Sequence, residues 1–159
     1  FISEYNNDHV YVGSNVVHRT SDKAKNWEVI SPDLTRRLLD SDEEKADIPG
    51  GPIQNDATGV EVYSSIFALE ESPHNEGEIW VGSDDGLIHI TRDGGKTWQN
   101  ITPKKIIPYE GTINKIELSS HSPGRAIVAV YNYRNSDPKP YIIMTDNYGE
   151  NWKLLTKKN

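Results

Sequence analysis

The sequence of 159 residues contains no cysteine. Disulfide frameworks, zinc ribbons, iron–sulfur clusters and thiol nucleophiles are therefore all excluded. Basic residues are also few relative to acidic ones, since 17 Lys and Arg stand against 24 Asp and Glu and give a net charge of −7. Because an acidic surface repels phosphate backbones, we expect no nucleic-acid partner.

Long apolar runs are missing as well. The longest uninterrupted run, Ala126–Tyr131, suits a buried strand and is far shorter than the ~18 residues of a membrane-spanning helix, so we expect no membrane span. The chain opens at Phe1 without the features of a signal peptide, so we expect a processed product or a piece of a longer chain. The 4 Trp and 8 Tyr are more than a disordered chain carries and predict a folded domain with aromatic burial.

An internal repeat is the main feature of the sequence. Three eight-residue segments, Thr20–Trp27, Thr91–Trp98 and Thr145–Trp152, share the form Thr-x-Asp/Asn-x-Gly-x-Thr/Asn-Trp. The second copy fits this form at every position, whereas the first has Ala24 in place of the glycine. Self-similarity of this kind is typical of repeat architectures.

Short β-rich stretches flank each of these corners. The predicted strands before the corners are His9–Gly13 and Val16–Thr20, Glu78–Gly82 and Leu87–Thr91, and Arg125–Tyr131 and Tyr141–Thr145. One more strand follows each corner, at Trp27–Ile30, Trp98–Ile101 and Trp152–Leu155, and a further strand precedes the second and third units at Ser64–Leu69 and Ile113–Leu118. The turn Ser83–Gly86 is a hairpin signal between two such strands. Each unit is thus predicted to be a four-stranded meander.

We therefore predict an all-β fold, a β-propeller segment of about three four-stranded antiparallel blades. The predicted organisation is a partial first blade over 1–31, an inserted loop over 32–59, a second blade over 60–102, a connector over 103–111 and a third blade over 112–159. A short helix around Thr35–Asp47 is compatible with the charges there but is demanded by no apolar stripe.

Three blades cannot close a ring of four to eight. We expect the chain to be a fragment of a larger propeller, with the remaining blades of the parent protein or complex as partners and with apolar faces on the two end sheets. Assembly of several copies into a ring is the weaker alternative, because the insertions are unequal.

Each residue type of the repeated corner has an expected structural role. Asp22 and Asp93 can accept backbone N–H groups that a tight turn leaves without strand partners. Gly95 and Gly149 suit a positive φ, and Ala24 predicts that the first corner differs. The tryptophan that ends each corner is expected to pack between neighbouring sheets.

This pattern resembles the Asp-box, or bacterial neuraminidase repeat, of β-propellers in sialidases, xyloglucan-degrading glycosidases and sortilin-type receptor ectodomains. Other stretches, including Thr58–Tyr63 and Ile79–Gly86, look like sortilin-repeat proteins that are often labelled glycosyl hydrolases. The resemblance implies a structural role for the boxes on an outer rim. The residues with this implied role are Thr20, Asp22, Trp27, Thr91, Asp93, Gly95, Thr97, Trp98, Thr145, Asn147, Gly149 and Trp152.

No residue is assigned a catalytic role. Asp84 and Asp85 are adjacent in a hairpin turn and are interpreted as turn residues. Sialidase chemistry needs an arginine cluster, a Tyr nucleophile and a Glu partner, and no arginine lies in the Arg-Ile-Pro motif expected of that family. A xyloglucan-cleaving enzyme needs two opposed acids, and nothing in the spacing selects among the candidates Asp33, Asp56, Glu61 and Glu70.

No metal or cofactor is predicted either. The histidines form no pair at metal-ligand spacing. The acidic run Asp40–Asp47 lacks the residue order of a calcium loop and is interpreted as a solvated surface.

The leading functional hypothesis is an extracytoplasmic binding or assembly module, secreted, periplasmic or at the cell surface, with a peptide, protein or glycan ligand. Tyr131, Tyr133 and Arg134, together with the insertion Pro32–Gly59, are the predicted partner surface. The alternative is a secreted glycoside hydrolase, and a third reading is a subunit of a larger cell-surface complex.

Overall fold

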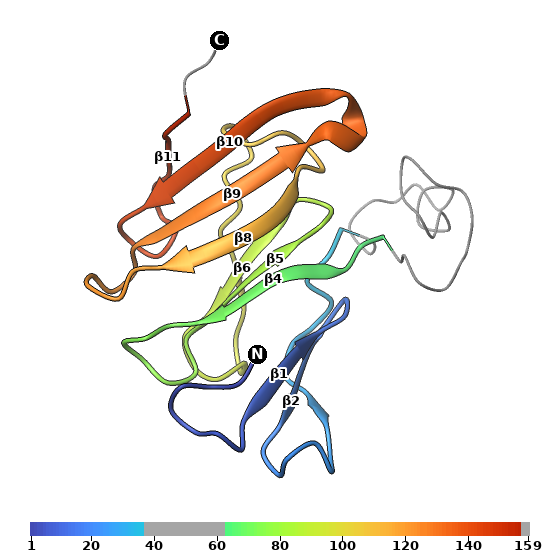
Figure 1. The fold of residues 1–159 in the computed structure, drawn as a ribbon, viewed down its shortest axis with the longest axis vertical. Coiled ribbons are helices and arrows are strands. Elements are labelled where there is room, and N and C mark those ends of the chain that lie inside the picture. Colours follow the sequence, from blue (N-terminus) through green and yellow to red (C-terminus); the bar gives the residue numbers. More distant parts are fainter. Residues whose placement is uncertain (37–62, 157–159) are drawn as a thin grey trace.

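The computed structural model of the chain describes residues 1–36 and 63–156. In these residues the secondary structure is strands, apart from one short 3-10 helix, η1 (Tyr133–Asn135). Three antiparallel sheets stack face to face along the length of the molecule (Figure 1). The predicted all-β class, built from three successive sheets, is confirmed.

The first sheet contains three strands, β1 (Val10–Gly13), β2 (Val17–Thr20) and β3 (Glu28–Val29), in that order. Ile2 adds an isolated antiparallel bridge to Val10 in place of a full first strand. This sheet is accordingly smaller than the other two.

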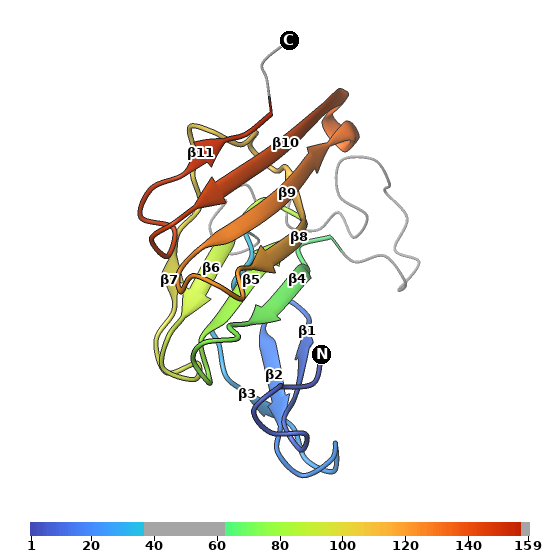
Figure 2. The ribbon, with the colours of Figure 1, turned by 60° about the vertical axis from the view of Figure 1, so that its left-hand side comes forward.

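The second and third sheets contain four strands each, and every strand pairs with its neighbour in the sequence. The second sheet consists of β4 (Ile66–Glu71), β5 (Ile79–Ser83), β6 (Ile88–Thr91) and β7 (Gln99–Asn100). The third consists of β8 (Thr112–Leu118), β9 (Ala126–Asn132), β10 (Asp137–Thr145) and β11 (Lys153–Leu154). The last strands, β7 and β11, lie on the same side of the stack (Figure 2).

Two apolar cores fill the spaces between the sheets. The first joins Tyr11 and Val17 of the first sheet to Ile79 and Val81 of the second. Because successive residues of a strand point to opposite faces, Trp80 of β5 enters the other core, between the second and third sheets. The second sheet is thus covered on both faces, and every residue of β5 and β6 is buried.

Glycines allow the sheets to approach closely. A Cβ on Gly13 would lie 2.6 Å from Cγ2 of Ile66, and a Cβ on Gly82 would lie 2.2 Å from Cγ2 of Ile113. Gly13 and Gly82 occupy equivalent positions in their sheets, because each pairs with the residue three positions before the threonine that begins the corner. Ala129 occupies the equivalent position in the third sheet. The side chains of Ile66 and Ile113 therefore occupy space that a Cβ at Gly13 or Gly82 would fill.

Apolar residues lie exposed on the outward faces of the two end sheets, as expected from the sequence. Val12 is exposed, whereas Val81, which holds the same register in the second sheet, is completely buried. Ile127 is exposed on the outward face of the third sheet. Positions that lie in a core within the stack thus face solvent at its ends.

Several predicted features fall on residues outside the described ones. They are the inserted loop and the helix around Thr35–Asp47 beyond residue 36, the acidic run Asp40–Asp47, and the acids Asp56 and Glu61. Among residues 1–36 and 63–156, no helix has the length and apolar character needed to cross a membrane.

Candidate functional site

The connections between strands lie at two opposite ends of the sheets. The repeated corners join β2 to β3, β6 to β7 and β10 to β11, and we call this the corner end. Because the strands are antiparallel, the β5–β6 turn and η1, which joins β9 to β10, lie at the other end, which we call the rim end. The two ends differ in chemistry.

The second corner is held by its aspartate. The Asp93 carboxylate accepts hydrogen bonds from the Thr97 backbone N–H (2.9 Å), the Thr97 hydroxyl (2.6 Å) and the Thr91 hydroxyl (2.8 Å). The Gly95 N–H donates to the Thr91 hydroxyl (3.0 Å). The hydrogen bonds from Thr97 are the main cause that lowers the pKa of Asp93 to about 2.

The first corner keeps this pattern in spite of its alanine. Asp22 accepts from the Asn26 backbone N–H (2.9 Å) and side-chain amide (2.6 Å), and Ala24 N–H donates to the Thr20 hydroxyl (3.1 Å). Ala24 adopts a φ of 65°. The expectation that this corner differs is therefore wrong for its backbone, because alanine takes up the left-handed conformation that glycine adopts more readily.

The third corner uses an amide in place of the carboxylate. Asn147 Oδ1 accepts from the Asn151 N–H (2.9 Å) and from the Thr145 hydroxyl (3.1 Å). The Gly149 N–H donates to the Thr145 hydroxyl (3.0 Å), with a φ of 81° at Gly149. Since Gly95 has a φ of 94°, the positive φ predicted for both glycines is confirmed.

The corner tryptophans connect each sheet to the preceding one. Trp98 Nε1 donates to the Ile30 carbonyl and Trp152 Nε1 donates to the Ile101 carbonyl, both at 2.9 Å. Trp27 is instead 44% exposed, because no sheet of the described residues precedes the first one. The expected packing between sheets is therefore present at two corners and absent at the first.

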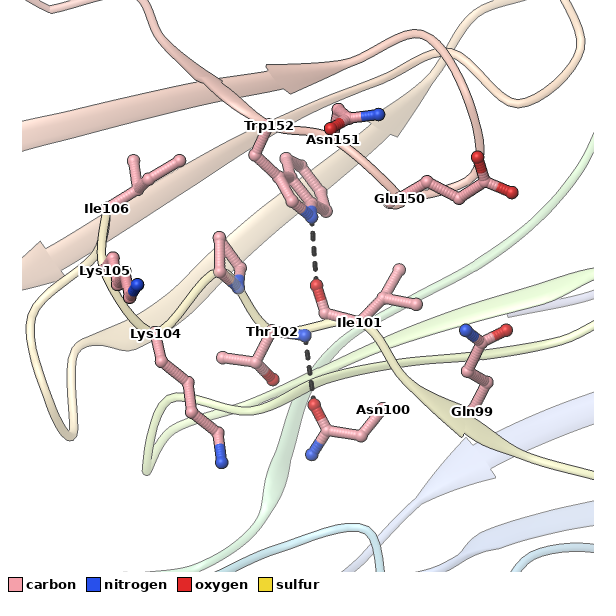
Figure 3. A pocket seen from close by; sticks show the side chains of 12 residues that line it. Gln99, Asn100, Ile101, Thr102, Lys104, Lys105, Ile106, Glu150, Asn151 and Trp152 are labelled. Carbon is pink, nitrogen blue, oxygen red and sulfur yellow. Dashed lines mark hydrogen bonds between the residues drawn. The ribbon is translucent and has the colours of Figure 1, made fainter.

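An open groove of about 620 Å³ accompanies the third corner, between the second and third sheets (Figure 3). Trp152 and Ile101 line it and are joined by the hydrogen bond from the indole, and Asn100 Oδ1 accepts from the Thr102 N–H (3.0 Å) nearby. The other polar side chains around it include Gln99, Lys104, Lys105, Glu150 and Asn151. Glu150 is the only carboxylate among the described residues that line the groove, so these residues do not supply the paired acids of a hydrolytic site.

The rim end contains two buried carboxylates in the β5–β6 turn. Asp85 is fully buried and accepts from the Ser83 hydroxyl (2.5 Å) and the Arg36 backbone N–H (2.8 Å). Arg36 Nε also donates to the Asp85 carbonyl (2.6 Å). Asp85 is thus fully engaged in tying the segment before residue 37 to the second sheet.

Asp84 is also buried, at 4% exposure, but is less completely paired. One carboxylate oxygen accepts from the Ser65 N–H (2.8 Å), and the other lies 3.8 Å from Arg134 Nη1. Burial is the main cause that raises the pKa of Asp84 to about 6. Because Arg134 belongs to η1, this contact connects the second sheet to the third.

Tyrosines surround these acids, and we call Tyr109, Tyr131 and Tyr133 the tyrosine rim. The rings of Tyr131 and Tyr133 stack with centroids 4.9 Å apart, and the Arg36 guanidinium lies 4.3 Å from the centroid of Tyr109. Tyr109 and Tyr133 are 57% and 58% exposed. The structure therefore brings the predicted surface of Tyr131, Tyr133 and Arg134 together with residues from the other connections.

Sequence reasoning missed Arg36, Tyr109 and the role of Asp84 in this cluster. Arg36 and Asp85 are 49 positions apart. They lie in connections, where no strand periodicity indicates which residues meet. The adjacent acidic pair in the β5–β6 turn was the available signal, and its interpretation as turn residues covers only part of what the pair contacts.

Of the four acids considered from the sequence for a xyloglucan-cleaving site, the structure describes Asp33 and Glu70, and both have other partners. Glu70 pairs with Lys115. Asp33 accepts from the Thr35 N–H (2.9 Å) and from the Asn15 amide (2.7 Å). Within the described parts of the chain, no group of three or more His, Asp or Glu is placed to hold a metal ion.

A tyrosine nucleophile is not favoured at the rim end. The Tyr63 hydroxyl is buried and has no hydrogen-bond partner among the described residues. Burial raises its pKa above the ordinary value of 10.0, with the charge of Glu110 as the next cause. An activated nucleophile requires a lower pKa or an adjacent base.

Comparison with known proteins identifies the fold of the chain. No protein-family model matches the chain. An oligoxyloglucan-reducing end-specific xyloglucanase of Emericella nidulans is 29% identical over 94 residues, which are 59% of this chain and 12% of that protein. The structure of YCF48 bound to D1 peptide has a TM-score of 0.55 and 19% identity, and the match covers 94% of this chain and 36% of that one. An ancestral GH74 enzyme has a TM-score of 0.60 and 15% identity, with 96% and 17% covered.

The chain therefore spans a minor part of the length of each protein that it matches. Identities below 25% carry the fold alone, and that fold is shared between a GH74 enzyme and a protein bound to a peptide. Together with the three stacked antiparallel sheets, the likeness identifies the chain as a segment of a β-propeller.

Proposed function

We propose that the chain is part of an extracytoplasmic β-propeller of the sortilin-like repeat type and acts as a non-catalytic binding or assembly module. One observation carries this proposal. The two acids of the rim end are buried, and the exposed Tyr109 and Tyr133 lie beside the arginines that contact them. Glycoside hydrolysis needs two carboxyl groups that reach the substrate, ~5 to 10 Å apart.

The corners support a structural role for the Asp-box residues. Asp22, Asp93 and Asn147 each use their side chain to hold the local turn. Trp98 and Trp152 bind to backbone of the preceding sheet. In this proposal the remaining blades of a parent propeller cover the apolar end faces in the same manner.

The tyrosine rim is the proposed ligand surface, with a peptide or protein as the ligand. Exposed aromatic rings supply large contact area at small entropic cost, and they are enriched in binding hot spots. The structure of YCF48, which has the same fold, is of that protein bound to D1 peptide. That likeness supports a peptide more directly than a glycan.

A glycoside hydrolase is the second candidate function. The xyloglucanase likeness favours it, and Asp84, with its pKa raised to about 6, has the protonation of a general acid. Its second acid would come from a blade outside the described residues.

A paired assay separates the two functions. The longest natural chain that contains these residues is incubated with a panel of xyloglucan, sialoside and other glycans, and in parallel with a peptide array. Retention of peptides that Tyr133→Ala abolishes, without release of reducing ends, supports the binding module. Tyr5→Ala, at a partly exposed tyrosine hydrogen-bonded to the Ser72 carbonyl, is the matched control. Release of reducing ends that Asp84→Asn abolishes would establish the hydrolase instead.

Proteolysis of intact cells tests the compartment. An extracytoplasmic propeller should be accessible to added protease at the cell surface or to protease after release of the periplasm, and a chain protected in both conditions would contradict the proposed location.

A further inference from the structure

Arg134 makes one long ion pair at the rim end. Its Nη1 lies 3.8 Å from Asp84 Oδ2, which is longer than a hydrogen bond, and its side chain is 26% exposed. No hydrogen bond of its guanidinium is found within residues 1–36 and 63–156. Since a guanidinium carries five N–H donors, Arg134 can bind a second anion from the solvent side.

The acid on the other side of Arg134 is poorly compensated. Among the described residues, backbone hydrogen bonds from Ser64 and Ser65 favour the ionised form of Asp84, but burial outweighs them, and Asp85, the next residue, carries a further negative charge. Arg36 is directed to Asp85 rather than to Asp84. The further titratable groups among the described residues of this cluster, Tyr63, Glu110, Tyr131 and Tyr133, add no positive charge.

We propose, building on the binding function proposed above, that Arg134 pairs with a carboxylate of a peptide ligand and gives up its contact with Asp84 when the ligand binds. The ligand's carboxylate accepts two N–H groups of the guanidinium, and the neighbouring ring of Tyr133 packs against an aromatic or proline side chain of the ligand. Asp84, left without its cation, takes a proton from solvent and stays buried as a neutral acid.

The position of the rings favours a peptide carboxylate over other anions. Arg134 follows Tyr133 directly, and Tyr133 is stacked on Tyr131 at 4.9 Å, so charge and aromatic surface are adjacent. A polyanion such as a nucleic acid would meet the net charge of −7 of the chain. One carboxylate beside a ring-bearing side chain avoids that repulsion.

The raised pKa of Asp84, about 6, agrees with this exchange. A carboxyl group in that condition needs little further change to be protonated near neutral pH. Ligand binding should therefore take up a proton, and affinity should rise as the pH falls toward 6.

Calorimetry with matched peptides tests the carboxylate. The probes are short acetylated peptides ending in Pro-Phe or Pro-Tyr, each made with a free carboxylate and with a C-terminal amide. We expect the carboxylate form to bind about tenfold or more tightly, because a charged hydrogen bond contributes about 1.5 to 3 kcal/mol. Arg134→Gln should reduce it to the level of the amide, and Arg134→Lys should restore only part of the difference.

The outcomes separate this inference from the binding function. If carboxylate and amide peptides bind equally, or if Arg134→Gln leaves the difference intact, the exchange is wrong while the binding module stands. If neither form binds and only a neutral oligosaccharide does, both proposals fail.

Binding measurements over a series of pH values test whether Asp84 takes up a proton when the ligand binds. For the wild-type chain the affinity for the carboxylate peptide should increase between about pH 8 and about pH 6. Asp84→Asn should bind more tightly at pH 8 and lose most of this dependence, because its side chain is neutral throughout. An unchanged slope in Asp84→Asn would overturn the role given to Asp84.

Discussion

At the scale of single residues, the two ends of the sheets treat carboxylates in opposite ways. Asp93 is exposed and surrounded by donors, and these lower its pKa to about 2. Asp84 is buried, and burial outweighs its hydrogen bonds and raises its pKa to about 6. The first stabilises the folded chain when ionised, whereas the second carries a cost when ionised.

Asp93 predicts a loss of stability in acid. A lowered folded-state pKa gives stability that is present above the ordinary value of 3.8 and is lost as the pH falls toward 2. Urea unfolding from about pH 5 to about pH 2 should therefore have a falling midpoint. In Asp93→Asn the unfolding midpoint should fall less over this pH range, because the contribution of the Asp93 carboxylate is absent. Asn147 indicates that an amide can hold such a corner, so this variant should fold.

Asp84 predicts the reverse dependence. Its raised pKa gives stability that is complete below 3.8 and is lost as the pH rises through about 6. Asp84→Asn should equal the wild type in acid and exceed it in unfolding midpoint at about pH 8. Equal midpoints across this range would contradict the burial cost assigned to Asp84.

At the scale of elements, the joints between sheets rest on glycine and tryptophan. Gly95 and Gly149 each face the residue that follows the outermost strand of the preceding sheet. A Cβ on Gly95 would lie 2.5 Å from the Ile30 carbonyl oxygen, and a Cβ on Gly149 would lie 2.6 Å from Cδ1 of Ile101. The tryptophan three positions later donates to the same backbone carbonyl. Positive φ and close approach thus both require glycine within the stack, and Ala24 occurs where no described sheet lies opposite.

Gly95→Ala should separate these two requirements when compared with Ala24→Gly. The added methyl group collides with backbone, so we expect a loss of about 2 to 3 kcal/mol in the free energy of unfolding. Ala24→Gly should gain up to about 1 kcal/mol, because it only relieves the left-handed conformation. Denaturant unfolding of both variants provides the measurement. If Gly95→Ala lowers the free energy of unfolding by no more than about 1 kcal/mol, the sheets accommodate the methyl group and the close approach does not require glycine.

Trp98→Ala should cost about 3 kcal/mol, since it opens a cavity in the joint and leaves the Ile30 carbonyl without its donor. Trp27→Ala is the matched control and should change the free energy of unfolding by less than about 1 kcal/mol in this chain, because the indole is largely in solvent. Thermal and urea unfolding measure both. Equal losses would refute the different roles assigned to the two tryptophans.

The strands were predictable because alternation and corner chemistry are local. Each expected strand has a counterpart, but β10 begins at Asp137 rather than at Tyr141. Two prolines occupy this start and cannot donate to the ladder, and the register shifts between Asp137 and Tyr141. A rule based on regular pairing therefore misses the beginning of the strand.

The rim end was predictable only in part. Tyr131, Tyr133 and Arg134 were recognised as a surface because they share one strand end. Their neighbours Arg36, Asp84 and Tyr109 come from three other connections, and long-range pairing of connections leaves no periodic trace in the sequence. The partners of a loop residue are set by how the sheets stack.

At the scale of the whole molecule, the stack is a series of similar joints with unequal ends. The second sheet is covered on both faces, whereas Val12 and Ile127 lie exposed on the outward faces of the first and third sheets. Because Val81, in the same register as Val12, is buried by a neighbouring sheet, we expect a partner to cover these outward faces. A partner that covers these faces should increase the stability of the first and third sheets most, which hydrogen exchange would detect as added protection of β1, β2, β9 and β10.

The sequential order of strands within each sheet has a consequence for synthesis. Every strand pairs with its neighbour along the chain, so no sheet waits for a distant segment in order to form. As the polypeptide leaves the ribosome, each meander can close once its own stretch has emerged and then dock onto the one made before it. Growth of the array in a single direction follows, with few long loops to close before the first native contacts appear.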